Sequence, residues 1–121
     1  MMRQIVFKGK SESSGEWIYG TLGEIDGKPY ISGLGYDTGE ETVAFVDGGT
    51  VGQFTGVLDK NGLRIFEGDR VAIHGLHPTQ VLGDVTFRDG AFGVTWVHNG
   101  VERFYAFVSM CNVEYEVLVW H

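Results

Sequence analysis

The sequence predicts a mainly β protein, with an N-terminal β part and a small, half-open β-barrel in the C-terminal half. The first observation is a set of Asp-Gly and Asn-Gly pairs, which tolerate the positive φ angles that two-residue hairpin turns require. These pairs are Asp26-Gly27, Asp47-Gly48, Asn61-Gly62, Asp89-Gly90 and Asn99-Gly100. The second observation is that the runs between them are rich in β-branched and aromatic residues, while no window of helical length carries a 3.6-residue apolar stripe.

Four candidate strands make up the N-terminal half, at residues 5–9, 16–22, 28–32 and 41–46. Each holds several β-branched or aromatic residues, as strands of a half-buried sheet usually do. Two connections between them are rich in glycine, serine or acidic residues, and we expect both to be mobile loops. They run from Gly9 to Gly15 and from Ser32 to Glu41.

The clearest hairpin lies around Asp89-Gly90. A two-residue loop there produces three facing pairs: Phe87 with Phe92, Val85 with Val94, and Gly83 with Trp96. All three pairs then lie on one side of the ribbon, because side chains alternate along a strand with a period of two. A slip by one residue would turn Arg88 toward the core, so the hydrophobic pattern specifies this register.

Three further segments complete the C-terminal half. Residues 67–74 turn into a strand that carries Val71 and Ile73, and residues 101–108 are apolar at both parities, which leaves their register open. Residues 113–119 alternate cleanly between apolar and acidic side chains. About five short strands therefore follow Asp69, which is enough for a small barrel with few free edges.

Composition and charge limit the classes of function. The chain has 121 residues, the length of one ordinary domain, and its 43% hydrophobic content is enough for a packed core. A net charge of −7 repels phosphate and disfavours a generic basic grip on nucleic acid. The single cysteine excludes an intrachain disulfide. There is no apolar signal core and no apolar stretch of ~18 residues, so we expect a cytoplasmic protein with no membrane segment.

A dense motif, VGQFTGVLDKNGLRIFEGDRV, occupies residues 51–71. It resembles the signature of the YopX family, which has an aromatic before Thr-Gly, then Asp-Lys-Asn-Gly, then an aromatic before Glu-Gly-Asp and a β-branched residue. The matching residues are Phe54, Thr55, Gly56, Asp59, Lys60, Asn61, Gly62, Phe66, Glu67, Gly68, Asp69 and Val71. The opening FKGKSESSGEWIYGTL and the hairpin GDVTFRDGAFGVTW are also similar to family segments, so the resemblance covers nearly the whole chain.

The resemblance implies a mainly β protein encoded by a phage or prophage in a bacterial host, and it implies no particular biochemical activity. We interpret most of the motif as turn chemistry, with Asp59 accepting backbone N–H bonds and Gly62 taking a positive φ. The residues to which we assign a structural role are Thr55, Gly56, Asp59, Asn61, Gly62, Gly68 and Asp69.

The turn at Glu67-Gly68-Asp69 is similar to the one that leads into the first strand of SH3-like barrels. We therefore expect a single domain over residues 1–121. Within it, the N-terminal β part covers about 1–50, the motif covers 51–71, and an SH3-like, half-open barrel covers about 69–121.

No cluster of residues amounts to a recognisable catalytic or metal site. His74 and His77 have a spacing found in metal sites, and His98 and His121 are the only other histidines, but no acidic or thiol ligand lies near the first pair. Cys111 is expected to be a small buried residue rather than a nucleophile. The one Gly-rich loop lacks the lysine and the following helix of a phosphate loop. We expect no metal, no cofactor and no enzymatic activity.

Aromatic residues suggest a binding role, because their number exceeds what two small sheets can bury on one side each. The residues in question are Trp17, Tyr19, Tyr30, Tyr36, Phe104, Tyr105 and Trp120. The candidate binding surface consists of Trp17, Tyr19, Tyr36, Lys60, Arg64, Glu67 and Trp120. We therefore expect a non-enzymatic protein that binds an unknown protein partner through an aromatic, acid-rimmed surface. The alternative is a two-layer fold that buries all of the aromatics.

Other functions stay open beside protein binding. A nucleic-acid-associated small β-barrel would need basic residues on one face beside exposed aromatics. The basic residues to test are Lys8, Lys10, Arg64, Arg70, Arg88 and Arg103. An acidic mimic of nucleic acid is a further alternative. A homo-oligomer would form where residues 113–119 present a free strand edge, with Trp120 as an anchor, unless that strand pairs internally.

Overall fold

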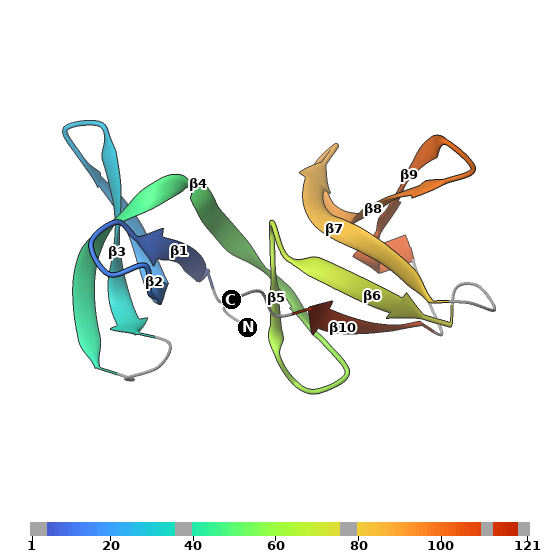
Figure 1. The fold of residues 1–121 in the computed structure, drawn as a ribbon, viewed down its shortest axis with the longest axis horizontal. Coiled ribbons are helices and arrows are strands. Elements are labelled where there is room, and N and C mark those ends of the chain that lie inside the picture. The colour runs from blue at the N-terminus through green and yellow to red at the C-terminus, as the bar shows by residue number, and fades with distance from the viewer. Residues whose placement is uncertain (1–4, 36–39, 76–79, 110–112, 119–121) are drawn as a thin grey trace. The chain divides into compact units, whose positions relative to one another are not determined.

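The computed structural model describes residues 5–35, 40–75, 80–109 and 113–118, and within them the chain is nearly all β-strand. It folds into two compact units, residues 1–54 and residues 55–121, which we call unit 1 and unit 2 (Figure 1). The boundary falls inside the motif at 51–71. The predicted mainly β fold class is confirmed. Among the described residues, no helix has the length and apolar character that a membrane crossing requires.

Unit 1 is an antiparallel sheet that closes on itself. Its strands are β1 (Phe7–Ser11), β2 (Trp17–Ile25), β3 (Lys28–Gly35) and β4 (Glu41–Leu58). Neighbours in sequence pair with one another, and β4 then pairs with β1 as well. The hydrogen-bonded ring is therefore complete, which removes the free edges of this unit.

The interior of this ring is narrow, because a barrel's diameter falls with the number of its strands. Its core is Ile18, Ile31 and Val46, each at most 1% exposed. Gly20 and Gly33 face each other across β2 and β3, and a Cβ on either one would collide with the other strand's backbone. The glycines are thus a geometric requirement of the small ring.

The predicted turn at Asp47-Gly48 is wrong, because both residues lie inside β4. The register between β1 and β4 shifts there, with extra residues on β4. The Asp47 carboxylate accepts the Gly49 N–H at 2.9 Å, and the Thr50 hydroxyl accepts the Lys10 N–H at 2.9 Å. These local bonds stabilise a bulge, and a bulge bends a strand. One long strand can therefore pair with β3 and then with β1.

Both predicted loops of unit 1 are shorter than expected. The first begins after Ser11, because Lys10 and Ser11 belong to β1, and Ser11 N–H donates to the carbonyl of Glu16 at 2.8 Å. In the second, Ser32 to Gly35 belong to β3, and residues 36–39 lie outside the described part of the chain.

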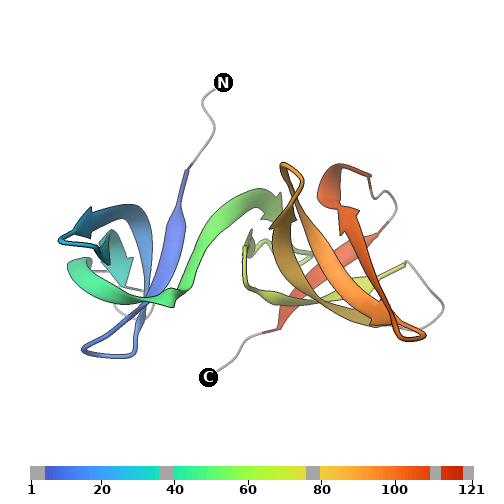
Figure 2. The same cartoon turned by 90° about the horizontal axis from the view of Figure 1, so that it is seen from above.

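Unit 2 has the half-open, barrel-like arrangement predicted for the C-terminal half. The end of β4 leads to β5 (Arg64–Phe66), β6 (Arg70–His74), β7 (Val81–Arg88), β8 (Ala91–His98), β9 (Val101–Ala106), a 3-10 helix (Phe107–Ser109) and β10 (Glu114–Leu118). The main sheet has the order β10-β6-β7-β8-β9 (Figure 2). The last strand along the chain, β10, thus pairs with β6, the first strand of this sheet in sequence. The core consists of Ile65, Val71, Ile73, Val85, Val94, Trp96 and Tyr115.

The predicted hairpin at Asp89-Gly90 is confirmed. Both residues have positive φ, 53° and 82°, as a type I′ turn requires. Phe87 pairs with Phe92, their rings 4.9 Å apart, and Val85 pairs with Val94. The same turn geometry occurs at Asp26-Gly27 and Asn99-Gly100. At Asn61-Gly62 only the glycine has positive φ, so that turn is not of the hairpin type.

Candidate functional site

The motif turn is built around the carboxylate of Asp59, which is only 6% exposed. One oxygen accepts the N–H groups of Asn61 and Leu63, both at 2.8 Å. The other accepts the N–H of Val117 at 3.0 Å, from a strand 58 residues further along the chain. The predicted role of Asp59 as a backbone acceptor is confirmed, and it reaches beyond the turn itself.

These bonds seal the outer edge of β10. The N–H of Lys60 donates to the carbonyl of Tyr115 at 2.8 Å, next to the bond between Asp59 and Val117. On its other side β10 pairs with β6. Burial raises the pKa of Asp59, but the bonds from Val117, Leu63 and Asn61, helped by the charge of Lys60, more than offset it, so the pKa lies below its ordinary value.

The rest of the motif also bonds within unit 2. The Thr55 hydroxyl donates to the carbonyl of Ile65 at 2.8 Å, and the Asp69 carboxylate accepts the Phe66 N–H at 2.8 Å. Gly68, at φ 93°, donates its N–H to the carbonyl of Val85 at 2.8 Å. The polar groups of the motif that make these contacts are therefore committed to the fold of unit 2.

The candidate binding residues divide between the two units. Trp17 and Tyr19 lie half-buried on the outside of the unit 1 ring, where the Lys8 ammonium lies 4.6 Å from the centre of the Trp17 ring. Tyr36 and Trp120 fall outside the described residues.

The other candidates, Lys60, Arg64 and Glu67, belong to unit 2, the first two exposed and the third half-buried. The Lys60 ammonium lies 4.0 Å from the carboxylate of Glu116, which also contacts His74 Nε2 at 3.1 Å. This group sits beside the sealed edge of β10 and links the motif turn to it.

Several large apolar side chains stand on the outside of the unit 1 ring, on β2, β3 and β4. We call Tyr19, Tyr30, Leu34, Val43 and Phe45 the apolar outer face. Tyr19 lies opposite Leu34 and Tyr30 opposite Phe45, with Val43 on the same side of β4. Leu34, Val43 and Phe45 are 50%, 69% and 43% exposed. Large apolar side chains that adjoin one another at such exposure are typical of an interaction surface.

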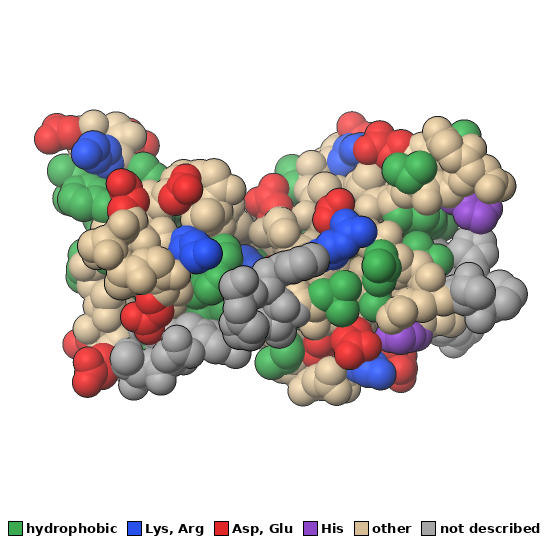
Figure 3. Space-filling view, in the orientation of Figure 1, with side chains coloured by type: hydrophobic (Ala, Val, Ile, Leu, Met, Phe, Trp, Pro, Cys, Tyr) green, Lys and Arg blue, Asp and Glu red, His purple; other side chains and the backbone are tan. Residues whose placement is uncertain are grey.

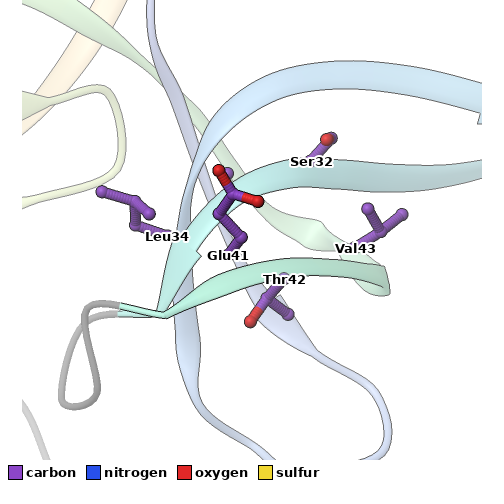
Figure 4. A pocket seen from close by; sticks show the side chains of 6 residues that line it. Ser32, Leu34, Glu41, Thr42 and Val43 are labelled. Carbon is purple, nitrogen blue, oxygen red and sulfur yellow. The ribbon is translucent and has the colours of Figure 1, made fainter.

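One end of this face borders a shallow depression of about 510 Å³ between β3 and β4. Figure 4 shows Leu34 and Glu41 extending from the neighbouring strands on one side, with Thr42 turned to the other. Sequence reasoning missed Leu34, Val43 and Phe45 as surface residues. The signal was present at residues 43–46, where apolar side chains stand at both parities, since such a strand has an apolar face on each side.

The six basic residues named in the sequence analysis divide between the two units. Lys8 and Lys10 adjoin Trp17 in unit 1, whereas Arg64, Arg70, Arg88 and Arg103 belong to unit 2. Within unit 2, Arg70 pairs with Asp84 at 3.0 Å and Arg88 with Glu102 at 3.5 Å. Figure 3 shows acidic and basic side chains interspersed on the visible surface.

Among the residues that the structure describes, no three His, Cys, Asp or Glu side chains gather closely enough to hold a metal ion. His74 bonds to Glu116, and His98 lies exposed on β8. His77, Cys111 and His121 lie outside the described residues, so the metal and nucleophile assignments that involve them stay predictions.

Comparison with known proteins identifies a family. No curated protein and no solved structure matches the chain. The family model described as YopX protein matches residues 6–118, which include both units and the whole motif. This extent agrees with the resemblance seen at residues 51–71, in the N-terminal strands and in the hairpin at Asp89-Gly90. The chain therefore belongs to the YopX family.

Proposed function

We propose that the protein is a non-enzymatic accessory factor of a phage or prophage, which acts in the cytoplasm of the bacterial host by binding a protein partner. The observation that carries this proposal is the apolar outer face of unit 1. Val43 is 69% exposed beside Leu34 and Phe45, and removing such an apolar side chain from water stabilises the complex with a partner.

The charged residues around this face indicate what kind of partner surface fits it. The described lysines of unit 1 stand on the outside of the ring: Lys8 lies opposite Tyr19, Lys10 opposite Trp17 and Lys28 opposite Ile25. The Lys28 ammonium lies 5.9 Å from the centre of the Phe45 ring. The sequence-based expectation was an acid-rimmed surface, but this face has lysines around it as well as Glu41. A partner with an apolar patch and acidic residues at its margin fits it best.

A matched pair of variants tests the face. Val43 and Val97 are both 69% exposed on strands, but Val43 belongs to the apolar outer face of unit 1 and Val97 to β8 of unit 2. Tagged Val43→Glu, Val97→Glu and unmodified proteins would be expressed in infected or lysogenic cells and captured with and without nuclease. We expect one protein partner that nuclease does not release, retained by Val97→Glu and lost by Val43→Glu. Retention by Val43→Glu would overturn the proposal.

A nucleic-acid ligand is the second candidate, favoured by the Lys8 and Lys10 ammonium groups at 4.6 and 5.9 Å from the Trp17 ring. Aromatic rings flanked by cations are typical of single-strand binding surfaces. The test is a titration of tryptophan fluorescence with a thymidine oligonucleotide at low salt. Quenching at a midpoint below about 100 µM, weakened by salt and by Lys8→Glu, would favour this candidate.

A further inference from the structure

Strand β9 ends the main sheet of unit 2 with an open edge (Figure 1). It pairs with β8 through six consecutive residue pairs, from Gly93 with Ala106 to His98 with Val101. Within the described part of the chain, no hydrogen bond joins its other side to a further segment. The opposite end of the sheet differs, because Asp59 and Lys60 bond to β10 there.

The turn between β8 and β9 fixes which backbone groups face outward. Asn99 and Gly100 form a two-residue hairpin loop, so the flanking pair His98 and Val101 is hydrogen-bonded and the bonding alternates from there. Val101, Arg103 and Tyr105 consequently bond to β8. The N–H and C=O groups of Glu102, Phe104 and Ala106 point away from the sheet and are available to another strand.

Apart from one inward-facing charge, the edge lacks the usual devices that prevent such pairing. It has no proline, no lysine and no register shift over its length. Its one inward-facing charge is Arg103, which stands opposite Trp96. Any strand that pairs with β9 therefore has to accommodate Arg103.

We propose that two copies of this chain pair through β9, antiparallel and related by a two-fold axis. In an antiparallel pair, a residue whose backbone groups point outward must lie opposite another such residue. Glu102, Phe104 and Ala106 of one copy must therefore lie opposite members of the same set in the other copy. A register centred on Arg103 sets two like charges opposite, and one centred on Glu102 does the same.

The register centred on Phe104 avoids both conflicts. It places Phe104 against the partner's Phe104, and Arg103 opposite the partner's Tyr105, which is 41% exposed in the single chain. A guanidinium over a tyrosine ring is a favourable contact, so the partner's Tyr105 accommodates the Arg103 charge, which would otherwise oppose strand pairing. The Arg88 guanidinium, 5.3 Å from the Phe104 ring, flanks the same contact. Registers centred on Tyr105 or Ala106 carry no like-charge conflict, but they pair only the last residues of β9, whereas the register centred on Phe104 pairs Glu102 to Ala106. Charge, hydrogen-bond parity and paired length together thus favour a second copy in this register.

The test compares Glu102→Pro with Glu102→Ala. Both remove the side chain that contacts Arg88, but only proline removes the outward N–H, and that N–H is not used by β8. Sedimentation over a roughly hundred-fold range of concentration should give a dimer for the unmodified chain and for Glu102→Ala, and a dissociation constant at least about ten-fold higher for Glu102→Pro. Salt should tighten the dimer, because each chain carries a net charge of −7.

A cross-link provides the second measurement, which does not depend on the proline variant folding. Paired residues in such a hydrogen-bonded position have Cα atoms about 5.5 Å apart, within the range that a disulfide spans. In a chain with Cys111→Ser, the substitution Phe104→Cys should give a covalent dimer on oxidation, and Val97→Cys on the neighbouring strand should not. A monomer throughout the sedimentation series, or equal cross-linking at both positions, would overturn the proposal.

Discussion

Replacing Asp59 tests whether the motif's main task is to hold β10 in place. Its carboxylate accepts three backbone N–H groups, and two of them, from Asn61 and Leu63, are local to the turn. The third, from Val117, joins residues far apart in sequence. A hydrogen bond to a charged group contributes about 1.5–3 kcal/mol, and bonds at one carboxylate are not additive. We expect Asp59→Ala to lower the free energy of unfolding by about 2–4 kcal/mol.

Asp59→Asn separates the long-range bond from the local ones. The amide keeps one oxygen, which can still accept from Asn61 and Leu63, but it turns an NH₂ group toward the N–H of Val117. Two donors then face each other at the edge of β10. We expect a loss of about 1–3 kcal/mol and faster amide exchange at Val117 and Tyr115, with little change in unit 1.

The measurements are urea unfolding and residue-resolved hydrogen exchange, with Asp89→Asn as the control. Asp89 lies exposed in a type I′ turn, where asparagine is equally suited, so that variant should stay within about 0.5 kcal/mol of the unmodified chain. Because the folded pKa of Asp59 lies below its ordinary value, its contribution is present above about pH 4 and is lost as the pH falls through the folded pKa. Unchanged exchange at Val117 in Asp59→Asn would refute the reasoning.

Three further predictions address the two cores and the hairpin turn at Asp89-Gly90. Gly33→Ala should lower the free energy of unfolding by about 2–4 kcal/mol in urea, because the added Cβ meets the Tyr19 carbonyl and the closed ring leaves no room for it. Gly27→Ala, in a turn where a Cβ meets nothing, should lower it by less. Burial raises the pKa of Tyr115 to about 12, so stability should be complete below pH 10 and fall by up to about 3 kcal/mol as the pH rises through 12. Tyr115→Phe should abolish that difference without destabilising the fold at pH 7, since the buried hydroxyl has no hydrogen-bond partner among the described residues. Gly90→Val should cost about 1–3 kcal/mol, because valine would be forced to φ 82°; an unchanged unfolding midpoint would contradict this.

Local signals explain why the hairpins were predictable. At Asp89-Gly90 the turn type, the alternation of side chains and the strand length all depend on residues that are close together in sequence. The backbone bonds of Asp59 inside its turn were predictable for the same reason. At Asp47-Gly48 the same dipeptide signal failed, because pairing of β4 with both β3 and β1 places these residues in a bulge.

Closure of unit 1 was not predictable, because it depends on contacts between β1 and β4, about 40 residues apart in sequence. Glycine inside a strand usually counts against a strand assignment, so Gly20 and Gly33, which face the interior of the ring, did not indicate closure. The candidate site was affected in the same way. The aromatic count led to Trp17 and Tyr19. The exposure of Val43 and Phe45 follows only from closure of the ring, because its narrow interior can bury the side chains of only one face of β4.

The motif shows why a dense run of polar residues is a poor guide to a binding surface in this protein. Asp59, Thr55 and Asp69 have buried side chains and bond to the backbone of unit 2, so replacing them is expected to change stability before it changes any contact with a partner. Unit 1 closes its ring and β10 is sealed, and among the described residues we identify two surfaces that a partner could satisfy. One is the apolar outer face of unit 1, which needs a partner's side chains; the other is the edge of β9, which needs a partner's backbone. Because these two needs are chemically different, the two substitutions should act independently. Val43→Glu should lose the protein partner but keep the dimer, and Glu102→Pro should weaken the dimer but keep the partner.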